Sequence, residues 1–387
     1  MTVDGLFAVV FIVALAVFLW ARRSRIEVQK ALFPLLYVIM YRSSFGLSWM
    51  KRFAQRFPRI LRVLGDIGTG VGFLGMALIA IELIRNTIML FTGSGVPGVQ
   101  PVLPIEAKGV FYIPFSYWII SIFLIALVHE FAHGVLANVH KMRVKSSGFA
   151  FLSIFVPIIP AAFVEPDEVQ LSAKPARSQL AVFAAGPFSN IIFAVLMFGI
   201  LALFNPLLSM AFLPGGVELT EVSGPALDSG LKDGDILIAL ADQPIHSSAN
   251  VSAVLSSYAP GDIIEVVTKD AVFNLTLGSS LSNESRPYMG IKASPHLDVN
   301  ETFAQMYGSV TPMILKWVST LFVVLFMINI GIGLFNLLPL GPLDGGRMFQ
   351  LVCVKLFRKN GIRVWSYVSL FFVVLIFVNL VVGLITV

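Results

Sequence analysis

The sequence predicts an α-helical polytopic membrane protein with about six transmembrane helices, a short membrane-associated β segment and a small α/β domain outside the membrane. Composition is the first reason. Apolar residues make up 57% of the 387 residues and charged residues only 13%, against roughly 25% charge in soluble domains. Too few charges remain to cover a water-facing surface. The second reason is a series of apolar runs that each provide the roughly 20 helical residues needed to cross a bilayer.

Six apolar runs reach that length, and we expect the first to be a retained anchor. They lie near 4–20, 67–90, 115–137, 180–204, 311–338 and 364–386. A different pattern occupies 148–164, where Pro157 and Pro160 disfavour a straight helix and the β-branched and aromatic residues favour strands packed against the helices. The shorter apolar patches of 31–47 are broken by Pro34, so we expect this segment to be interfacial or re-entrant.

Basic residues predict the orientation, because Lys and Arg in short loops mark the cytoplasmic side of a membrane. Ten of them lie between positions 22 and 62, so this loop is expected to be cytoplasmic. Alternation then places both termini and the segment 205–310 outside. Four Asn-x-Ser/Thr sequons agree, because all of them start within that segment. The basic residues flank apolar runs instead of forming a groove with interleaved aromatics, so we expect no nucleic-acid partner.

The third apolar run carries His129, Glu130 and His133. Residues four apart lie on one face of a helix, so both imidazoles can bind a single zinc ion, and Glu130 can take a proton from water beside them. Ionisable side chains cost at least a few kcal/mol each near a bilayer centre, and a metal offsets that cost. The single cysteine, Cys353, excludes a cysteine cluster. The alternative is an interhelical hydrogen-bond cluster.

A catalytic zinc usually takes three protein ligands, and Asp344 is the candidate for the third. It lies at the cytoplasmic end of the fifth run, in a segment whose prolines and glycines would end the helix and turn the chain back. The third and fifth runs cross in the same direction, so both motifs reach the same membrane depth. The alternative for Asp344 is an ordinary turn or helix-cap aspartate.

Four motifs together resemble the site-2 protease family of intramembrane zinc metalloproteases. They are HisGluPheAlaHis at 129–133, AsnLeuLeuProLeuGlyProLeuAspGlyGly at 336–346, AlaAlaGlyProPheSerAsn at 184–190 and PheValGluProAspGlu at 163–168. The resemblance implies one Zn²⁺ per chain, held by His129, His133 and Asp344, with Glu130 as the base.

The same resemblance places Asn336 close to the metal. Its side-chain amide could donate to the scissile carbonyl or to the developing oxyanion. An interhelical hydrogen bond is the alternative. We interpret Asn190 and the pair Gly186 and Pro187 as shaping the start of the fourth helix and its packing.

Residues 214–295 change character, with short alternating strands, turn residues and charges of both signs. The segments 224–245 and 259–267 resemble a PDZ domain of the protease-associated kind, and 288–291 resembles its closing strand. The resemblance implies a groove that binds an extracytoplasmic peptide or C-terminus by strand pairing. Its carboxylate-binding loop is expected near Pro214 to Leu219.

These observations predict five parts. They are N-terminal helices with a basic cytoplasmic loop (1–114), the first part of a catalytic membrane core (115–213), the PDZ-like domain (214–295), the second part of the core (296–350) and a C-terminal helix (351–387).

The predicted function is an intramembrane zinc endopeptidase in the cell membrane, acting on single-pass membrane proteins from a site within the bilayer toward its cytoplasmic side. Residues 148–164 are expected to pair with the unwound substrate by β-augmentation. The alternatives are an inactive membrane scaffold that presents the PDZ-like domain and a metal-ion transporter.

Overall fold

A computed structural model describes residues 3–32, 36–92, 98–154, 156–280 and 283–386. Pro34 lies outside these residues. The chain separates into two compact units, which are Met1–Leu201 with Thr320–Val387, and Ala202–Ser319. The second unit is wider at both ends than the predicted PDZ-like domain. Near its ends, Ala211, Phe212 and Phe303 form a small buried cluster that 214–295 does not include.

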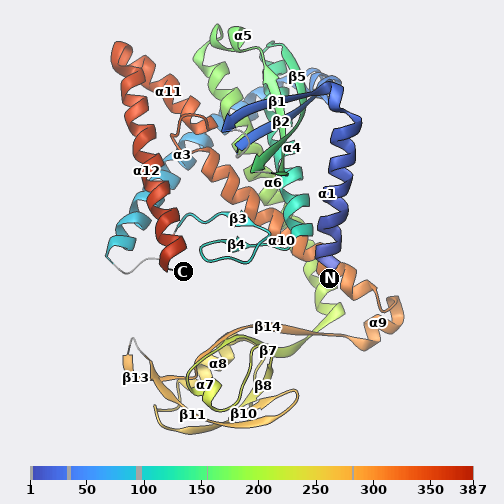
Figure 1. Ribbon diagram of the computed structural model, residues 1–387, viewed down its shortest axis with the longest axis vertical. Helices are drawn as coiled ribbons and strands as arrows, with labels where there is room; N and C mark the ends of the chain where they lie inside the picture. Colours follow the sequence, from blue (N-terminus) through green and yellow to red (C-terminus); the bar gives the residue numbers. More distant parts are fainter. Residues whose placement is uncertain (1–2, 33–35, 93–97, 155, 281–282, 387) are drawn as a thin grey trace. The chain divides into compact units, whose positions relative to one another are not determined.

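Within the described residues, six helices are long and apolar enough to cross a membrane, and they match the six predicted runs. They are α1 (Val3–Ala21), α3 (Pro58–Phe91), α4 (Phe115–Val139), α6 (Ala176–Ala211), α10 (Thr311–Asn336) and α12 (Gly361–Thr386), shown in Figure 1. The helix α3 starts at Pro58, before the predicted run 67–90, because the charged residues of its first turns do not belong to an apolar run. Proline is favoured at the first position of a helix. The predicted fold class is confirmed.

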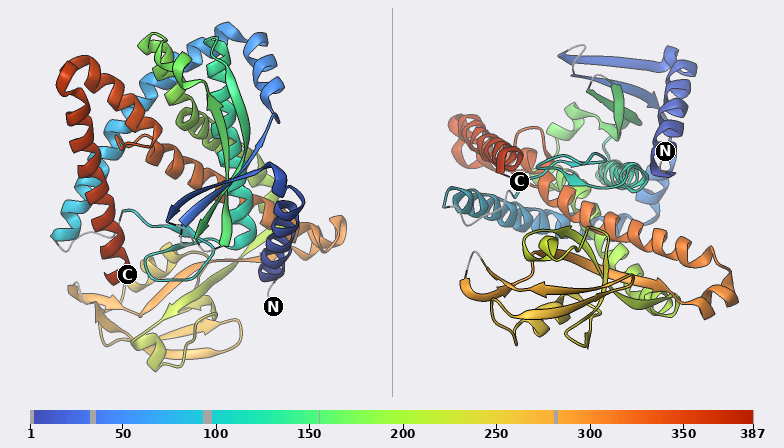
Figure 2. Two further views of the ribbon diagram at one scale, coloured as in Figure 1. Left: turned by 45° about the horizontal axis from the view of Figure 1, so that its top comes forward. Right: turned by 60° about the horizontal axis from the view of Figure 1, so that its bottom comes forward.

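The β segment is larger than predicted. It is a four-stranded antiparallel sheet in the order β1-β2-β5-β6, formed by β1 (Ile26–Leu32), β2 (Leu36–Ser43), β5 (Val144–Ile154) and β6 (Val156–Pro166). Figure 2 shows the β1–β2 hairpin beside β5 and β6. The apolar patches of 31–47 were expected to be interfacial or re-entrant, whereas most of this segment pairs as strands. Pairing with β5 satisfies backbone groups that would otherwise be buried without partners.

One arginine connects all four strands of this sheet. Arg42 on β2 donates from Nε to Glu27 on β1 at 2.9 Å and from Nη1 to the Ser146 hydroxyl on β5 at 3.2 Å. It also pairs with Glu165 on β6. The sheet is therefore held across its width by side chains as well as by its backbone ladder.

Shorter elements complete the first unit. They are η1 (Arg23–Arg25), α2 (Leu47–Arg56), β3 (Val102–Leu103), β4 (Phe111–Tyr112), α5 (Glu168–Ser172), α11 (Asp344–Phe357) and η2 (Arg358–Asn360). The carboxylate of Asp4, in the first turn of α1, accepts hydrogen bonds from the backbone amides of Phe115 and Ser116 at 2.6 and 2.8 Å. It therefore caps the start of α4, whose own N-cap residue, Pro114, makes no side-chain cap hydrogen bond.

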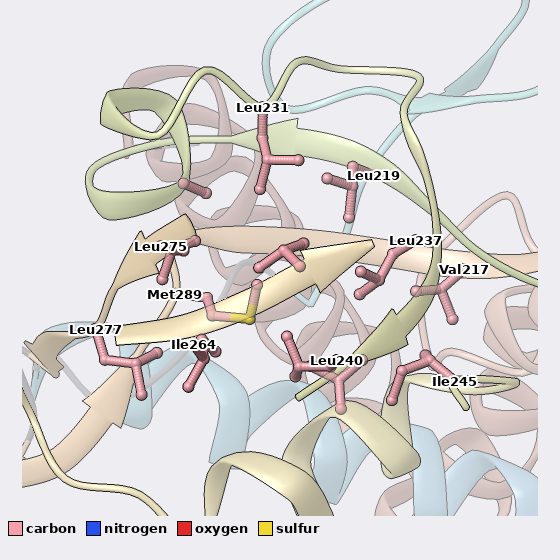
Figure 3. Packing of buried hydrophobic residues seen from close by; sticks show 13 residues of the cluster. Val217, Leu219, Leu231, Leu237, Leu240, Ile245, Ile264, Leu275, Leu277 and Met289 are labelled. Atoms are coloured by element: carbon pink, nitrogen blue, oxygen red, sulfur yellow. The ribbon is translucent and has the colours of Figure 1, made fainter. Parts of the chain in front are cut away.

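The second unit is a small α/β domain, as predicted for a PDZ-like fold. Its main sheet has the order β11-β10-β8-β7-β14, with β9 paired to β8. Apolar side chains from this sheet and α7 point toward one another in its core (Figure 3). The elements are β7 (Phe212–Val222), α7 (Pro225–Asp228), β8 (Ile236–Leu240), β9 (Gln243–Pro244), α8 (Ser248–Leu255), β10 (Ile263–Thr268), β11 (Val272–Thr276), β12 (Gly278–Ser280), β13 (Asn283–Tyr288), β14 (Ile291–Val299) and α9 (Glu301–Tyr307).

Two details of this domain differ from expectation. The segment Pro214 to Leu219 is not a loop, because it lies within β7 and pairs with β14 along its length. Of residues 288–291, Tyr288 ends β13 and Ile291 starts β14, and Gly290 between the two strands takes a positive φ of 85°. The closing strand is β14 itself, which lies at the edge of the sheet.

Candidate metal centre

His129 and His133 lie one helical turn apart on α4, and both are buried. Their Nε2 atoms are 3.1 Å apart, so the two imidazoles point to a common position. This is the arrangement that their spacing predicts for a helix.

Asp344 completes the group from another part of the chain. Its Oδ2 atom is 3.0 Å from Nε2 of His129 and 3.4 Å from Nε2 of His133. Tetrahedral bonds of the length that zinc makes to nitrogen and oxygen would hold ligand atoms roughly 3.3 Å apart. The two nitrogens and one oxygen therefore match a zinc site in both chemistry and spacing.

A tight turn between α10 and α11 carries Asp344 to the histidines. The helix α10 ends at Asn336, and α11 starts at Asp344. Here α11 packs directly on the backbone of the turn, because a Cβ atom on Gly345 would lie 2.7 Å from the Cα of Leu337, and one on Gly346 would lie 2.9 Å from the nitrogen of Gly341. Only glycine fits such an approach.

The helix α12 holds this turn from its other side. Trp365 donates from Nε1 to the carbonyl of Gly346 at 3.0 Å, and the Ser369 hydroxyl donates to the carbonyl of Pro339 at 3.2 Å. The position of the Asp344 carboxylate is therefore set by packing and hydrogen bonds from two helices.

The helix α6 lies behind the two imidazoles. Nδ1 of His133 is 2.7 Å from the carbonyl oxygen of Val182, and Nδ1 of His129 is 3.2 Å from the side-chain amide of Asn190. Between them, a Cβ atom on Gly186 would contact Nε2 of both histidines. Gly186 thus leaves open the space that a bound metal would need.

Glu130 lies beside this group and is fixed by strand β6. Its Oε2 atom accepts a hydrogen bond of 2.9 Å from the backbone amide of Val164. Since β6 is an edge strand, this amide points away from the ladder with β5 and toward α4. The carboxylate is therefore oriented by the backbone of the strand.

A cavity of about 430 Å³ joins these groups. Its polar lining includes His129, Glu130, His133, Asn190, Asn336 and Asp344. The structure thus brings together all five residues that the sequence suggested for the site, with Asn336 at the end of α10. Glu130 also borders a second, mostly apolar cavity of about 480 Å³ lined by parts of α2, α3 and α6.

Sequence reasoning assigned Gly186 and Asn190 to helix packing and did not include Val182. A signal was present in the motif AlaAlaGlyProPheSerAsn, which contains two of the three. Positions 182, 186 and 190 are four residues apart and therefore share one face of α6. Positions 129 and 133 have the same spacing and share one face of α4. What the motif alone could not indicate is that this face is turned toward the histidines.

Comparison with known proteins supplies an independent finding. Residues 117–377 match the peptidase family M50. The chain is 27% identical over 346 residues to an uncharacterized protein of Methanocaldococcus jannaschii, covering 87% of this chain and 83% of that protein. It is 26% identical over 205 residues to a membrane-bound transcription factor site-2 protease homolog of Arabidopsis thaliana, covering 50% of this chain and 38% of that protein.

Among solved structures, a PDZ domain of an SdrC-like protein from Listeria monocytogenes is similar to part of this chain. The identity is 22% and the TM-score is 0.19, with 20% of this chain and 87% of that domain covered.

Proposed function

Because the chain belongs to peptidase family M50, we propose that it is an intramembrane zinc endopeptidase that cleaves membrane proteins within or near their transmembrane segments. The observation that carries the proposal is the convergence of two imidazoles and a carboxylate beside Glu130. These groups come from helices long and apolar enough to cross a membrane and from the turn that follows one of them.

His129, His133 and Asp344 would hold the zinc ion. When bound, zinc lowers the pKa of water and polarises the carbonyl of the scissile peptide bond. The spacing of the three ligand atoms and the open space in front of Gly186 support this assignment.

Glu130 acts as the general base. It removes a proton from the attacking water and returns it to the amine of the leaving peptide. The amide of Val164 holds one carboxylate oxygen, and because Glu130 lines the metal cavity, the other can face the reacting water. This hydrogen bond limits the rotation of the carboxylate.

Asn336 provides a hydrogen-bond donor for the oxygen that becomes negatively charged during attack. Its place in the lining of the metal cavity supports this role. An interhelical hydrogen bond is the alternative, and it predicts that Asn336→Ala lowers stability without a specific loss of the cleavage rate.

Strand β6 is the proposed docking edge for the substrate. A helical substrate must unwind before attack, because its carbonyls are otherwise hydrogen-bonded within the helix. The unwound segment pairs with the outer edge of β6, where Ala162 and Val164 line the metal cavity, through backbone groups other than the Val164 amide that donates to Glu130. The neighbouring apolar cavity offers room for apolar side chains of that segment.

The test is cleavage of a single-pass membrane substrate by purified protein. Glu130→Gln is expected to abolish cleavage while zinc content stays at one per chain, because the ligands remain. Equal cleavage by Glu130→Gln and wild type would overturn the proposal. Zinc uptake into proteoliposomes without any cleavage would favour the transporter alternative, and zinc retention without either activity would favour the inactive scaffold.

A second candidate function belongs to the PDZ-like domain, which we propose binds extended peptides at β14. The strand is an edge of its sheet, and the Ser248 hydroxyl of α8 donates to the carbonyl of Ala293 on it at 3.1 Å. A helix beside the edge strand of a sheet is the arrangement used for strand addition. Fluorescence anisotropy with peptides that carry free or amidated C-termini tests it, and no binding of either set would contradict it.

A further inference from the structure

We propose that Asn190 is a positioning residue whose side-chain oxygen accepts the Nδ1 proton of His129 and so keeps Nε2 of His129 available to the metal. The inference rests on the proposed zinc site. It assigns to Asn190 a role in metal binding in place of the helix packing that the sequence suggested.

The first step is the location of the amide. Asn190 on α6 is fully buried, at 0% exposure, and its side-chain Nδ2 atom lies 3.2 Å from Nδ1 of His129, while its Oδ1 atom is buried without a hydrogen-bond partner among the described residues. On the other side of the same imidazole, Nε2 lies 3.0 Å from Oδ2 of Asp344. The ring of His129 is thus held between Asn190 and the proposed metal position.

The second step is the proton on the imidazole. A neutral histidine that gives the lone pair of Nε2 to a metal carries its proton on Nδ1, so Nδ1 is a donor and needs an acceptor. The two ends of an asparagine amide exchange places by a rotation of 180°, and the protonation of the neighbouring group decides which end faces it. Opposite a protonated Nδ1, Asn190 must present Oδ1.

The third step is the second histidine, which shows the same arrangement without ambiguity. Nδ1 of His133 is 2.7 Å from the carbonyl oxygen of Val182, and a carbonyl oxygen can only accept. His133 therefore carries its proton on Nδ1 and directs Nε2 to the metal position. One face of α6 supplies both acceptors, and Asn190 is the one of the two that a substitution can remove.

The fourth step distinguishes this contact from ordinary packing. Asn329 on α10 is also fully buried, and its amide donates to the carbonyl of Leu325, one turn back on its own helix, at 2.6 Å. That bond is the usual use of a polar side chain inside a helix. The amide of Asn190 instead contacts a proposed metal ligand, which makes Asn329 a control matched in residue type and burial.

The experiment measures zinc affinity of the full-length protein by competition with a chelator. Asn190→Leu removes the acceptor and is expected to weaken zinc binding about 10- to 100-fold. Asn190→Asp keeps an acceptor and is expected to bind within about threefold of wild type. Asn329→Leu loses a buried hydrogen bond but no contact to a ligand, so its zinc affinity should be unchanged.

Two outcomes separate this inference from the proposed function. If Asn190→Leu binds zinc as tightly as wild type while His129→Ala does not bind it, the positioning role of Asn190 is wrong and the zinc site stands. If wild type and His129→Ala are equally unable to bind zinc, the proposed function itself fails. A further measurement uses the wild-type protein alone, so it does not depend on whether a variant folds. The ¹⁵N chemical shifts of the imidazole nitrogens report which nitrogen of each histidine carries the proton. A zinc-loaded His129 with its proton on Nε2 would overturn the inference.

Discussion

At the scale of single residues, the proposed metal site depends on the absence of a side chain as much as on its ligands. Gly186 lies where a methyl group would contact Nε2 of both histidines. A helix can approach its neighbour this closely only through glycine. Gly186 therefore leaves room for the two imidazoles, and for a metal beside them, against α6.

Gly186→Ala is expected to abolish stoichiometric zinc binding, because the added methyl competes with the metal for the same space. Gly199→Ala is the matched control on the same helix, since nothing lies within 4 Å of a Cβ atom there. It should bind zinc normally and be slightly more stable, by about 0.5–1 kcal/mol at most. Metal analysis of the purified proteins measures the first effect, and thermal unfolding measures the second. Normal zinc content in Gly186→Ala would contradict the assignment.

Removal of the metal should lower stability only when the ligands are intact. A ligand that binds the folded state at 100 times its Kd stabilises it by about 2.7 kcal/mol. Chelation is therefore expected to lower the Tm of the wild type, and to leave the Tm of Asp344→Ala almost unchanged. Thermal unfolding with and without chelator checks this. An equal decrease in both proteins would show that the chelator acts elsewhere.

The sequence was sufficient for residues whose spacing carries the chemistry. His129, Glu130 and His133 are predictable because a helix brings residues four apart onto one face. Asp344 required the additional argument of membrane depth. Asn190 and Val182 were not predictable, because their roles depend on which face of α6 is turned toward α4.

At the scale of elements, the four-stranded sheet depends on contacts between segments far apart in the sequence. The ion pairs of Arg42 with Glu27 and Glu165 join its two outer strands to the centre. The hydroxyl of Ser146 and the guanidinium of Arg42 lower the pKa of Glu165 below its usual value. The side chain of Glu165 is 40% exposed, so its contribution to stability is small.

This lowered pKa predicts a pH dependence with a defined sign. A carboxyl group whose pKa falls on folding stabilises the protein above its unfolded pKa, about 4.3 for Glu, and loses that effect as the pH falls through the folded value. The Tm difference between wild type and Glu165→Gln should thus be largest above about pH 5 and shrink below about pH 4. Glu106→Gln, at an exposed loop position outside this sheet, is the control for the loss of one carboxylate.

The turn that carries Asp344 gives a prediction for a single methyl group. Gly345→Ala would push a Cβ atom into the backbone of Leu337 and should destabilise the protein by about 1–3 kcal/mol or more. Gly70→Ala on α3 is the comparison, because nothing lies within 4 Å of a Cβ atom there. Thermal unfolding distinguishes them. Equal stability of the two variants would contradict the close packing of α11 on the turn.

Helices were easier to predict than strands. Each long apolar run was found because hydrophobicity alone marks it. The hairpin β1–β2 was not found, since its partner β5 lies more than a hundred residues away and only that pairing explains it. The helix α11 was missed for a related reason, because it follows the Asp344 turn directly and mixes apolar residues with Lys355.

At the scale of the whole molecule, the orientation in the membrane stays a prediction from the distribution of basic residues. Lys232 lies in the second unit and Arg56 in the basic segment after α1, and both are exposed. The single native cysteine, Cys353, is 1% exposed, so it should not react in the folded protein. The chain is therefore suited to cysteine labelling.

Lys232→Cys is expected to react with a membrane-impermeant maleimide in intact cells. Arg56→Cys should react only after the membrane is permeabilised, because the basic segment is predicted to be cytoplasmic. Labelling of both sites after permeabilisation is the control for accessibility. The reverse pattern in intact cells would show that the predicted orientation is wrong.

The pairing of β2 with β5 also has a consequence for how the chain is made. Arg42 and its partner Ser146 are separated by 104 positions. At a synthesis rate of about 5–20 residues per second, β2 leaves the ribosome roughly 5–20 s before β5 exists. Throughout that interval the hairpin has an unpaired edge, which other chains could bind. Membrane insertion of α3 and α4, which are made in between, cannot shorten this interval, because β5 is synthesised only after both helices.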